Sequence, residues 1–415
     1  MEIHILRLPL YEPVRVGTIW ASRDGAEFQY EESYLSSEAA VPLSLSLPLR
    51  NEPYSKSAMQ PYFEGLLPEG PARIDLAQQI GIREEDSFAL LAECGRECIG
   101  DVMTEEDGAS RIQTASYAEL DDSELHRLFT DGHTLAVENA ASRMSLAGTQ
   151  GKVGLARGVD GKWYRPQGLA ASTHILKTSN LHDEPVVEFL CMRTASRCGL
   201  DAAEVELLDF GKPVLAVKRF DRNAMSGNEG LTVQRLHQED LAQAMGIWPS
   251  GKYTELKGGT ICAIAELLRQ QSARPLEDLK QFAAILLFSY AVGNCDAHLK
   301  NYSLRYRADE LELAPAYDLV STSYFPRFSR ELAVSYGGVR DIDLVGPSEL
   351  EQVAKDLGIS RPALHDIAQG IAENVVHGIM DSADKLDIGM QDLGYTVAED
   401  LIDEVTPRLN VIQKL

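Results

Sequence analysis

The nine residues from Gly293 to Asn301, Gly-Asn-Cys-Asp-Ala-His-Leu-Lys-Asn, constrain the fold of this chain more than any other stretch. They follow an apolar segment with helical spacing, and the residues after them alternate in the pattern of a β-hairpin. Asp296 precedes Asn301 by five positions, and Asp318 follows the hairpin. Protein kinases use this order of side chains: the first Asp orients the attacking hydroxyl, and the Asn and the second Asp hold magnesium ions. The stretch therefore predicts a phosphoryl-transfer loop.

Two side chains lie between the predicted base and the first predicted metal ligand. Many protein kinases place a lysine two residues after the base, and His298 occupies that position here. We therefore expect His298 or Lys300 to contact the γ-phosphate. Asp and Asn are also common loop residues, and Gly-Asn is a turn signal, so the rest of the chain has to support this interpretation.

A glycine-rich segment, Ser142 to Gly154, lies upstream and is bordered by strand-like sequence. Such a loop lets backbone N–H groups approach phosphates closely, although alone it is more often a turn. A strand that carries Lys177 follows, and then a helix from about Asp183 that carries Glu188. Alone, Lys177 reads as an edge-strand lysine that discourages aggregation. With the downstream loop, the order favours a phosphate contact in a nucleotide-binding lobe.

Several strings in this chain resemble those of the HipA family of bacterial toxin kinases. The string Gly-Asn-x-Asp-x-His-x-Lys-Asn ends at Asn301, and the family's Ser-x-Ala-Gly-x-Gln-x-Lys loop is matched from Ser145 to Lys152. A Phe-Glu-x-Leu-Leu-Pro-Glu-Gly string begins at Phe63. The resemblance implies a hinge at Val217 and Phe220 that holds adenine. With Lys177 from the argument above included, the implied ATP-binding residues are Ser145, Ala147, Gly148, Thr149, Gln150, Lys152, Lys177, Val217 and Phe220.

The resemblance also implies a function. It indicates a serine/threonine protein kinase that uses ATP and Mg²⁺ and acts as the toxin of a toxin–antitoxin system linked to persistence. The acceptor would be a cytoplasmic protein such as glutamyl-tRNA synthetase or another synthetase. Autophosphorylation of Ser145 would displace the loop, because a phosphate adds negative charge where ATP phosphates sit. The implied partner is a HipB-like helix-turn-helix antitoxin.

The charge balance agrees with a basic partner. The chain has 415 residues and a net charge of −24, so it does not present a broad basic surface to nucleic acid, and DNA would be bound only through the antitoxin. Six scattered cysteines without paired Cys-x-x-Cys sites predict reduced thiols in a cytoplasm. The first residues lack a signal-peptide core, and no apolar run is long enough to span a bilayer, so we expect no membrane role.

The patterns predict an α+β fold with two lobes of protein-kinase type. We expect an N-terminal α+β module at 1–105, an acidic linker at 106–135, a nucleotide-binding lobe at 136–222 and a mainly helical catalytic lobe at 223–415. The last lobe has helical periodicity at about 260–271, 276–292, 348–357, 362–386 and 395–411. Within these ranges we expect an edge strand at 43–49 and a capping box at 348–351. His237 is expected to be a surface or packing residue.

Two other classes of function stay open at this point. One is a kinase of small molecules on the same scaffold, because a nucleotide site does not specify the acceptor. The other is a non-catalytic nucleotide-binding corepressor of an antitoxin. The complete set of Lys177, Asp296, Asn301 and Asp318 favours the protein kinase over the corepressor.

Overall fold

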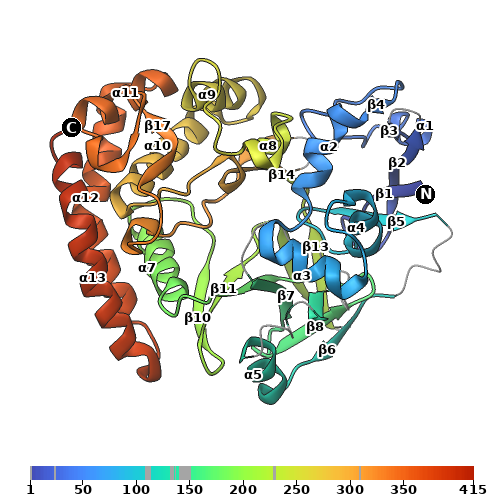
Figure 1. Cartoon of the computed structure of the whole chain (residues 1–415), viewed down its shortest axis with the longest axis horizontal. Coiled ribbons are helices and arrows are strands. Elements are labelled where there is room, and N and C mark those ends of the chain that lie inside the picture. The colour runs from blue at the N-terminus through green and yellow to red at the C-terminus, as the bar shows by residue number, and fades with distance from the viewer. Residues whose placement is uncertain are drawn as a thin grey trace. The chain divides into compact units, whose positions relative to one another are not determined.

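The computed structural model describes residues 2–22, 25–107, 114–130, 135, 137–139, 151–227, 230–307 and 310–415 (Figure 1). The chain forms two compact units. Unit 1 comprises Met1–Ser179, Phe210–Gly251 and Arg305–Asp309, and unit 2 comprises Asn180–Asp209, Lys252–Leu304 and Glu310–Leu415. Helices and sheets both contribute to the architecture, which confirms the predicted α+β class.

Unit 1 begins with a five-stranded antiparallel sheet in the order β4-β3-β2-β1-β5. Its strands are β1 (Glu2–Arg7), β2 (Val14–Ser22), β3 (Gly25–Tyr30), β4 (Tyr54–Ser55) and β5 (Val102–Glu106). The apolar alternation of the sequence shifts phase after Ile5, and the pairing of β1 with β2 changes register there. Ile3 and Ile5 therefore join one buried cluster, whereas Leu6 and Leu8 join another with Met103.

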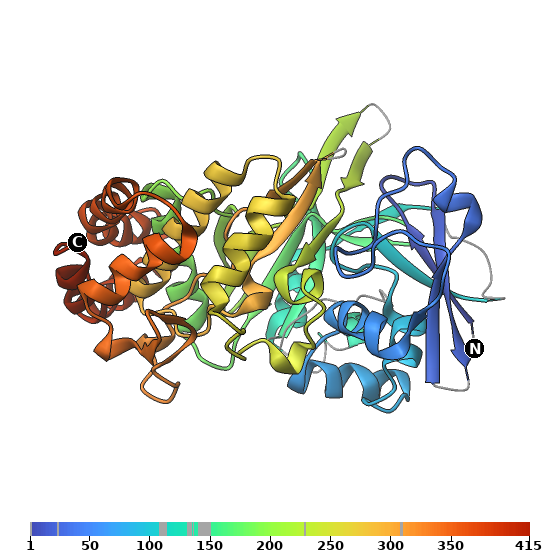
Figure 2. The same cartoon turned by 90° about the horizontal axis from the view of Figure 1, so that it is seen from above.

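The first sheet packs against short helices that the sequence places between β3 and β5 (Figure 2). These helices are α1 (Glu32–Leu35), α2 (Lys56–Gly65), α3 (Gly70–Ile80) and α4 (Ser87–Cys94). Phe28 of β3 contacts Phe63 of α2 edge to face, with ring centroids 5.5 Å apart. Both rings are fully buried, so this aromatic contact is part of the module's core.

The second sheet of unit 1 contains consecutive strands in the order β11-β9-β7-β8-β6. They are β6 (Ser116–Glu119), β7 (Gly151–Arg157), β8 (Trp163–Gln167), β9 (His174–Thr178) and β11 (Pro213–Lys218). Helix α5 (Asp122–Thr130) follows β6 within the range predicted as an acidic linker. Because β9 lies between β7 and β11, the lysine-bearing strand occupies an interior position of the sheet.

The remaining elements of unit 1 are β12 (Arg222–Gly227), β13 (Gly230–Arg235), β14 (Gln238–Asp240), α8 (Leu241–Ala244) and the 3-10 turn η1 (Pro249–Gly251). The predicted edge strand at 43–49 is wrong, because this segment is a turn with a single bridge between Ser44 and Leu47. The carboxylate of Glu239 binds the Ser44 hydroxyl and the Leu45 amide, so side-chain contacts replace strand pairing.

His237 is a packing residue rather than a surface one, since only 2% of it is exposed. Its Nδ1 lies 2.8 Å from Asp101 Oδ1, and its Nε2 lies 3.0 Å from the Leu43 carbonyl oxygen. Arg7 also binds Asp101, at 2.8 Å. Burial alone would raise the pKa of Asp101, but His237 and Arg7 hold that pKa below its ordinary value.

Unit 2 is built mainly from helices. They are α7 (Glu184–Arg197), α9 (Thr260–Gln271), α10 (Pro275–Val292), α11 (Pro347–Leu357), α12 (Arg361–Ala383) and α13 (Ile388–Ile412). Helix α12 packs against α7, α10 and α13 (Figure 1). The predicted start of α7 near Asp183, with Pro185 in its first turn and Gly199 beyond its end, is confirmed.

The predicted capping box at 348–351 is wrong in its register. Helix α11 begins at Pro347, and its N-cap is Gly346. The Glu349 carboxylate accepts a hydrogen bond from the Gly346 amide at 2.9 Å. The second hydrogen bond of a capping box needs a side chain at the N-cap, and glycine has none. Proline is favoured in the first helical turn because it has no N–H to satisfy there, and this explains the earlier start.

The other elements of unit 2 are short. They are β10 (Val205–Asp209), η2 (Leu299–Asn301), β15 (Ser303–Arg307), β16 (Glu310–Leu313), η3 (Thr322–Tyr324), β17 (Glu331–Tyr336), β18 (Val339–Asp341) and η4 (Ile342–Leu344). Strands β15 and β16 are sequential neighbours in one sheet, which confirms the predicted hairpin after the loop. Residues 305–307 of β15 belong to unit 1.

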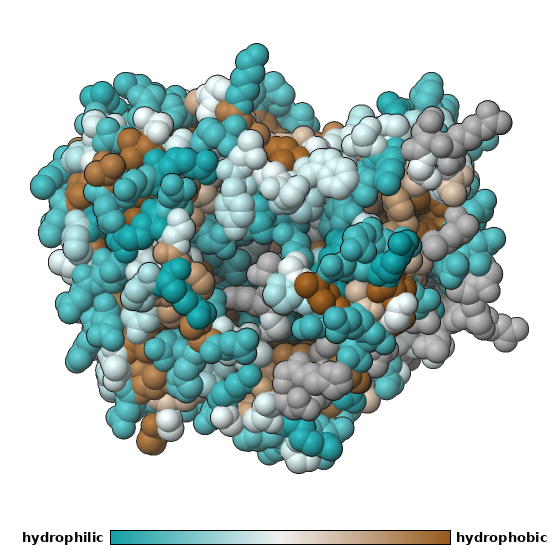
Figure 3. Space-filling model, in the orientation of Figure 1, coloured by the Kyte–Doolittle hydropathy of each residue, from teal (hydrophilic) through white to brown (hydrophobic). Residues whose placement is uncertain are grey.

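The visible surface is mainly hydrophilic, and hydrophobic residues appear as small separate patches (Figure 3). This distribution agrees with a charged-residue content of 25%. Among the residues that the structure describes, none of the helices combines the length and the apolar character that crossing a bilayer requires.

Candidate active site

The end of α10 positions the predicted phosphoryl-transfer loop. Gly293 lies in the left-handed region at φ 76°, where a side chain would be strained. Its amide donates to the Tyr290 carbonyl at 3.1 Å, and the Asn294 amide donates to the Ser289 carbonyl at 2.8 Å. This pair of bonds is a Schellman motif, which ends the helix and turns the chain sharply into the loop.

The segment after Asp318 holds the start of this loop. The Thr322 hydroxyl accepts from the Cys295 amide at 2.8 Å and donates to the Gly293 carbonyl at 3.2 Å. The Ser323 amide also donates to the Gly293 carbonyl, at 3.0 Å. The backbone polar groups at the helix end are therefore satisfied by residues from a distant part of the chain, and the loop is fixed.

Asp296 lies at the centre of a set of hydrogen bonds and is half-buried. Its amide donates to Asn294 Oδ1 at 3.0 Å. Its carbonyl oxygen accepts from the His298 amide at 2.8 Å and from Asn301 Nδ2 at 3.2 Å. Its carboxylate accepts from the Tyr253 hydroxyl at 2.6 Å. The backbone of Asp296 is therefore fixed, and its carboxylate contacts the hydroxyl group of Tyr253. Both features suit a residue that accepts a proton.

His298 and Lys300 are both buried, with 6% and 8% of their surfaces exposed. The His298 ring meets the Tyr253 ring edge to face, with centroids 5.0 Å apart. The Lys300 carbonyl accepts from the Tyr317 hydroxyl at 2.8 Å. The structure thus brings both residues to the loop, and their contact with a phosphate stays a prediction.

Asn301 and Asp318, the predicted magnesium ligands, are flanked by residues that contact one another. Tyr317 precedes Asp318 in the sequence, and Lys300 precedes Asn301. The Tyr317 hydroxyl donates a hydrogen bond to the Lys300 carbonyl. The same hydroxyl lies 2.7 Å from the Ser303 hydroxyl at the start of the hairpin. These bonds hold the ends of the hairpin, and with them the two predicted ligands, in a fixed relation.

The donor set fits magnesium that is shared with a nucleotide. The side-chain nitrogen of Asn301 donates to the Asp296 carbonyl, so the side-chain oxygen of Asn301 is the candidate ligand for a cation. Asp318 has φ 59°, and among the described residues it is the only one other than glycine with a positive φ. A strained backbone at a carboxylate is typical of functional sites.

No group of three or more His, Cys, Asp or Glu side chains that could enclose a metal occurs in the part of the chain that the structure describes. Mg²⁺ in kinases is bound by one or two protein ligands together with water and phosphate oxygens, so a fully protein-built cage is not required. Asn301 and Asp318 could therefore hold it only together with a nucleotide.

Unit 1 holds the predicted nucleotide contacts. Lys152 of β7 and Lys177 of β9 are directly opposite each other in the antiparallel register, so both side chains project from the same face. Two ammonium groups on one face favour an anionic ligand such as a polyphosphate. Ser145, Ala147, Gly148, Thr149 and Gln150 lie outside the described residues, so the structure gives no account of them.

The predicted adenine hinge follows β11. Val217 is buried, with 8% exposed, and its register partner is Ile175 on β9. Phe220 is half-buried. Between them, Arg219 donates its amide to the Thr173 carbonyl at 2.9 Å. The segment that the sequence assigns to adenine is therefore attached to the strand that carries Lys177.

Sequence reasoning missed a buried network of charges beside this hinge. The Glu97 carboxylate contacts Arg219 at 3.2 Å, Arg222 at 3.3 Å and Arg235 at 2.8 Å. Asp221 contacts Arg219 and Arg222, both at 2.8 Å. Burial alone would raise the pKa of Glu97, but the three guanidinium groups lower it to about 2. The charged string from Arg219 to Arg222, directly after an apolar strand, is the sequence signal that could have indicated it.

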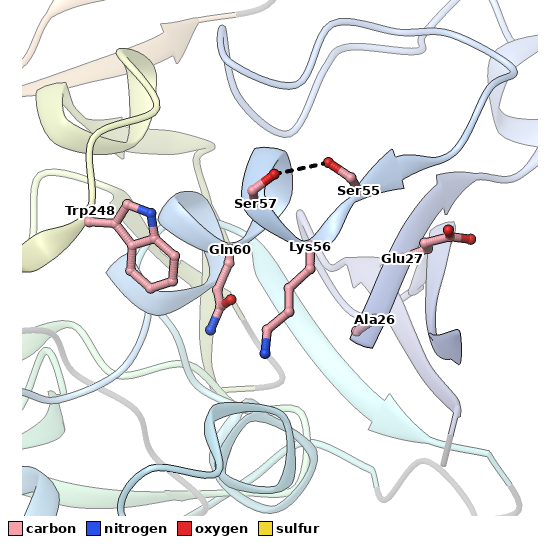
Figure 4. Close-up of a pocket in the computed structure, with 7 residues that line it drawn as sticks. All are labelled: Ala26, Glu27, Ser55, Lys56, Ser57, Gln60 and Trp248. Carbon is pink, nitrogen blue, oxygen red and sulfur yellow. Dashed lines mark hydrogen bonds between the residues drawn. The ribbon is translucent and has the colours of Figure 1, made fainter. Parts of the chain in front are cut away.

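A cavity of about 360 Å³ in unit 1 has none of the predicted site residues in its lining (Figure 4). It is lined by Ala26, Glu27, Ser55, Lys56, Ser57, Gln60 and Trp248. The hydroxyls of Ser55 and Ser57 lie 3.2 Å apart and bind each other. This contact pairs two neutral hydroxyls and supplies no general base, so we assign the cavity no chemistry.

Comparison with known proteins places this arrangement in a family. The model of the HipA-like C-terminal domain matches residues 144–379, and that of the HipA N-terminal domain matches residues 10–105. The protein Y4mE of Sinorhizobium fredii is 34% identical over 384 residues, which cover 89% of this chain and 90% of Y4mE. The serine/threonine-protein kinase toxin HipA of Shewanella oneidensis is 29% identical over 362 residues, which cover 83% and 81% of the two chains.

A solved structure has the same fold. It contains HipA of Shewanella oneidensis with HipB and operator DNA, and its HipA-like chain superposes with a TM-score of 0.83 at 24% identity over 99% of this chain and 98% of that one. The likeness extends over both units. The two family models and the identity to Y4mE lead to one conclusion: this chain belongs to the HipA family.

Proposed function

We propose that this chain is an ATP- and Mg²⁺-dependent serine/threonine protein kinase that acts as the toxin of a HipBA-type toxin–antitoxin pair. The observation that carries the proposal is the closed loop in which Asn301 binds the backbone carbonyl of Asp296. This bond fixes a candidate metal ligand relative to a candidate base, as phosphoryl transfer requires. The name of the Shewanella oneidensis relative, a serine/threonine-protein kinase toxin, supports the same function.

In the proposed reaction, Asp296 accepts a hydrogen bond from the serine hydroxyl of the acceptor and takes its proton. The serine oxygen forms a bond to the γ-phosphorus of ATP, the bond from that phosphorus to the bridging oxygen breaks, and ADP leaves. Asn301 and Asp318 would hold Mg²⁺, which offsets the charge on the phosphate oxygens. His298 and Lys300 are the loop residues that we expect near the γ-phosphate.

We assign the nucleotide to the residues of unit 1. Lys152 and Lys177 supply two positive charges on one face of the sheet, and these support a polyphosphate site. The backbone and side chains of Ser145, Ala147, Gly148, Thr149 and Gln150 would cover the phosphates. Val217 and Phe220 would contact adenine. Phosphorylation of Ser145 would disfavour the covering position of this loop through charge repulsion.

We infer a HipB-like antitoxin as the partner, and we place the pair in the cytoplasm. The solved structure with this fold contains HipB and operator DNA, and a net charge of −24 favours a basic partner over direct contact with DNA. For the acceptor we infer a cytoplasmic protein, with glutamyl-tRNA synthetase or another aminoacyl-tRNA synthetase as the first candidates to test.

The test is incubation with γ-labelled ATP and Mg²⁺, with and without cell extract, followed by mass spectrometry. We expect phosphate on Ser145 and on an extract protein with the wild type, and none with Asp296→Asn. Asp384→Asn is the matched control, because it makes the same change at an exposed carboxylate that binds Tyr395. ATP binding without transfer would indicate the corepressor, and a phosphorylated metabolite without phosphoprotein would indicate a small-molecule kinase.

A further inference from the structure

The carboxylate assigned as the catalytic base already binds a hydroxyl of its own chain. The Tyr253 hydroxyl donates a hydrogen bond to Asp296 Oδ1 at 2.6 Å. A substrate hydroxyl has to lie within about 2.6–3.2 Å of the base that takes its proton. The Tyr253 oxygen therefore occupies a hydrogen-bonding position on Oδ1 that an acceptor oxygen would use, and it does so with the same kind of donor group.

Several contacts hold Tyr253 over the loop. Its carbonyl accepts from Arg340 Nη2 at 2.9 Å, and the same guanidinium binds the carbonyls of Leu332 and Ala333. Its ring packs edge to face against His298. The preceding carbonyl, that of Lys252, lies 3.5 Å from the Leu299 amide. The backbone on either side of the phenol is thus attached to the catalytic loop and to the β17–β18 sheet.

The C-terminal side of the same segment is anchored as well. The Glu255 carboxylate accepts from the Thr260 amide at 2.6 Å and from the Ser335 amide at 3.4 Å. Burial alone would raise the pKa of Glu255, but these hydrogen bonds lower it. Gly258 and Gly259 follow with φ 87° and 103°, which ends the anchored segment in a sharp change of direction.

The side chain itself remains able to leave. Tyr253 is 44% exposed, although its backbone is held at both ends. Rotation about its first side-chain bond moves the phenol into solvent without disturbing the backbone contacts. The arrangement therefore combines a fixed main chain with a displaceable hydroxyl, which is what a competitor for the acceptor position needs.

We propose that Tyr253 is an internal mimic of the acceptor: in the resting enzyme its hydroxyl occupies the hydrogen-bond position on Asp296, and an incoming serine or water has to displace it. This inference rests on the proposed function, in which Asp296 is the base. The contact keeps water from the base while no acceptor is present, so it suppresses wasteful hydrolysis of ATP. A hydroxyl presented by a docked protein competes better, because docking supplies binding energy that water lacks.

The test uses the full chain, ATP·Mg²⁺ and water as the acceptor probe, with release of phosphate as the measurement. Tyr253→Phe removes only the oxygen and leaves the ring against His298. We expect it to raise the rate of hydrolysis about tenfold without a change in the KM for ATP. The double variant Tyr253→Phe with Asp296→Asn should return to the low rate of Asp296→Asn alone. Tyr395→Phe is the matched control, because it removes an exposed Tyr–Asp hydrogen bond of 2.8 Å and should leave the rate unchanged.

A second measurement needs no turnover. A phenol that donates to a carboxylate has an altered near-ultraviolet absorption, so the difference spectrum of wild type minus Asp296→Asn should contain a tyrosine band. The same difference taken in the Tyr253→Phe background should lack it. Its presence in both backgrounds, or its absence from both, would show that the contact does not exist in solution and would overturn the inference.

The rates separate this inference from the proposed function. A rate in Tyr253→Phe equal to or below that of the wild type, with Asp296→Asn impaired, overturns the acceptor mimic. A lower kcat would instead make Tyr253 a positioning residue that orients the base. No detectable hydrolysis in either protein, with ATP bound normally, also counts against the mimic. Full activity of Asp296→Asn, or no binding of ATP, would overturn the proposed function itself.

Discussion

The side-chain nitrogen of Asn301 donates a hydrogen bond to the backbone carbonyl of Asp296 at 3.2 Å, so the candidate metal ligand fixes the position of the candidate base. We propose two roles for this side chain: its nitrogen fixes the loop, and its oxygen would bind a cation. The backbone N–H of Asn301 also donates to the His298 carbonyl at 2.9 Å, which fixes the main chain of this residue.

Replacement of Asn301 separates these roles. Asn301→Ala removes both, and we expect phosphoryl transfer to fall by at least about a hundredfold, because metal-ion stabilisation of the transition state contributes several kcal/mol. Asn301→Asp keeps an oxygen ligand but places an oxygen against the Asp296 carbonyl. We expect it to be less active than the wild type but more active than Asn301→Ala at high Mg²⁺. Titration of the rate with Mg²⁺ measures this order, and equal activity of all three proteins would remove Asn301 from the site.

Gly293 shapes the loop through its conformation and its packing. Its φ is 76°, and a β-carbon there would lie 2.6 Å from Arg408 Nη2 and still closer to the Ser323 hydroxyl. Arg408 is buried and donates to the Ala291 carbonyl at 3.2 Å, so it cannot move away freely. We expect Gly293→Ala to lower the free energy of unfolding by about 1–2 kcal/mol for the strained backbone, and by a further 1–3 kcal/mol or so for the clash, with loss of activity.

Gly338 offers a matched control for this substitution. It has φ 86°, and no described atom lies within 4 Å of the place where its β-carbon would be. Gly338→Ala should therefore show the backbone cost alone and keep its activity. Chemical denaturation of the two variants measures the difference, and equal losses would mean that the packing of Gly293 against Arg408 and Ser323 is unimportant.

Local patterns predicted the local structure well. The periodicity predicts a helix at 260–271, and α9 has these bounds. The hairpin after Asn301 and the glycine that ends α7 were also visible, because each depends on residues close in sequence. The prediction of a strand at 43–49 was wrong because the conformation of this segment depends on Glu239, which lies 195 positions after Ser44 in the sequence. An apolar alternation cannot distinguish a strand from a turn that a distant carboxylate stabilises.

The same limit applies to the site. The spacing of Asp296 and Asn301 predicted that both lie in one loop, and their hydrogen bond confirms this, whereas their catalytic and metal-binding roles stay a prediction. The contact of Tyr253 with Asp296 was not predicted, because it joins positions 43 apart. The partners of Glu97 are still more distant, at 122 to 138 positions. Pairings of this kind depend on how the strands assemble, which no local pattern records.

Glu97 connects the N-terminal module with the predicted adenine hinge inside unit 1. It is 4% exposed and faces three guanidinium groups, so Glu97→Gln removes one of the two carboxylates that compensate this buried cluster and leaves Asp221 as the other. We expect the free energy of unfolding to fall by about 3–5 kcal/mol. Because Arg219 lies between Val217 and Phe220, we also expect the KM for ATP to rise more than kcat falls. Urea denaturation and steady-state kinetics measure the two effects.

The control for Glu97 is the same change at an exposed pair. Glu119 binds Lys162 at 2.5 Å, and both side chains are about half exposed (51% and 54%). Water screens this pair, so Glu119→Gln should leave the unfolding midpoint and the KM unchanged. A similar loss of stability in both variants would mean that the burial of Glu97 confers no special strength on its contacts.

Glu239 gives the protein a dependence of stability on pH. Burial raises its pKa to about 7 from an ordinary value of 4.5, despite hydrogen bonds from Ser44, Leu45 and Tyr306 that favour the ionised form. Between these two pH values the folded protein holds a proton that the unfolded chain releases. Stability is therefore fully present below about pH 4.5 and is lost as the pH rises through 7, by an amount on the order of 3 kcal/mol.

Glu239→Gln tests this dependence, because its neutral amide can keep the hydrogen bonds from Leu45 and Tyr306 at every pH. Urea denaturation at several values between pH 5 and 8 should show that the variant is increasingly more stable than the wild type as the pH rises. Glu349→Gln is the control. Hydrogen bonds from Ser348 and Gly346 lower the pKa of Glu349, so this carboxylate stays ionised in the folded protein between pH 5 and 8. The effect of Glu349→Gln on the free energy of unfolding should therefore be constant over this range. A constant difference between Glu239→Gln and the wild type would mean that the buried carboxyl is already ionised at pH 5, and that its contacts offset the cost of burying its charge.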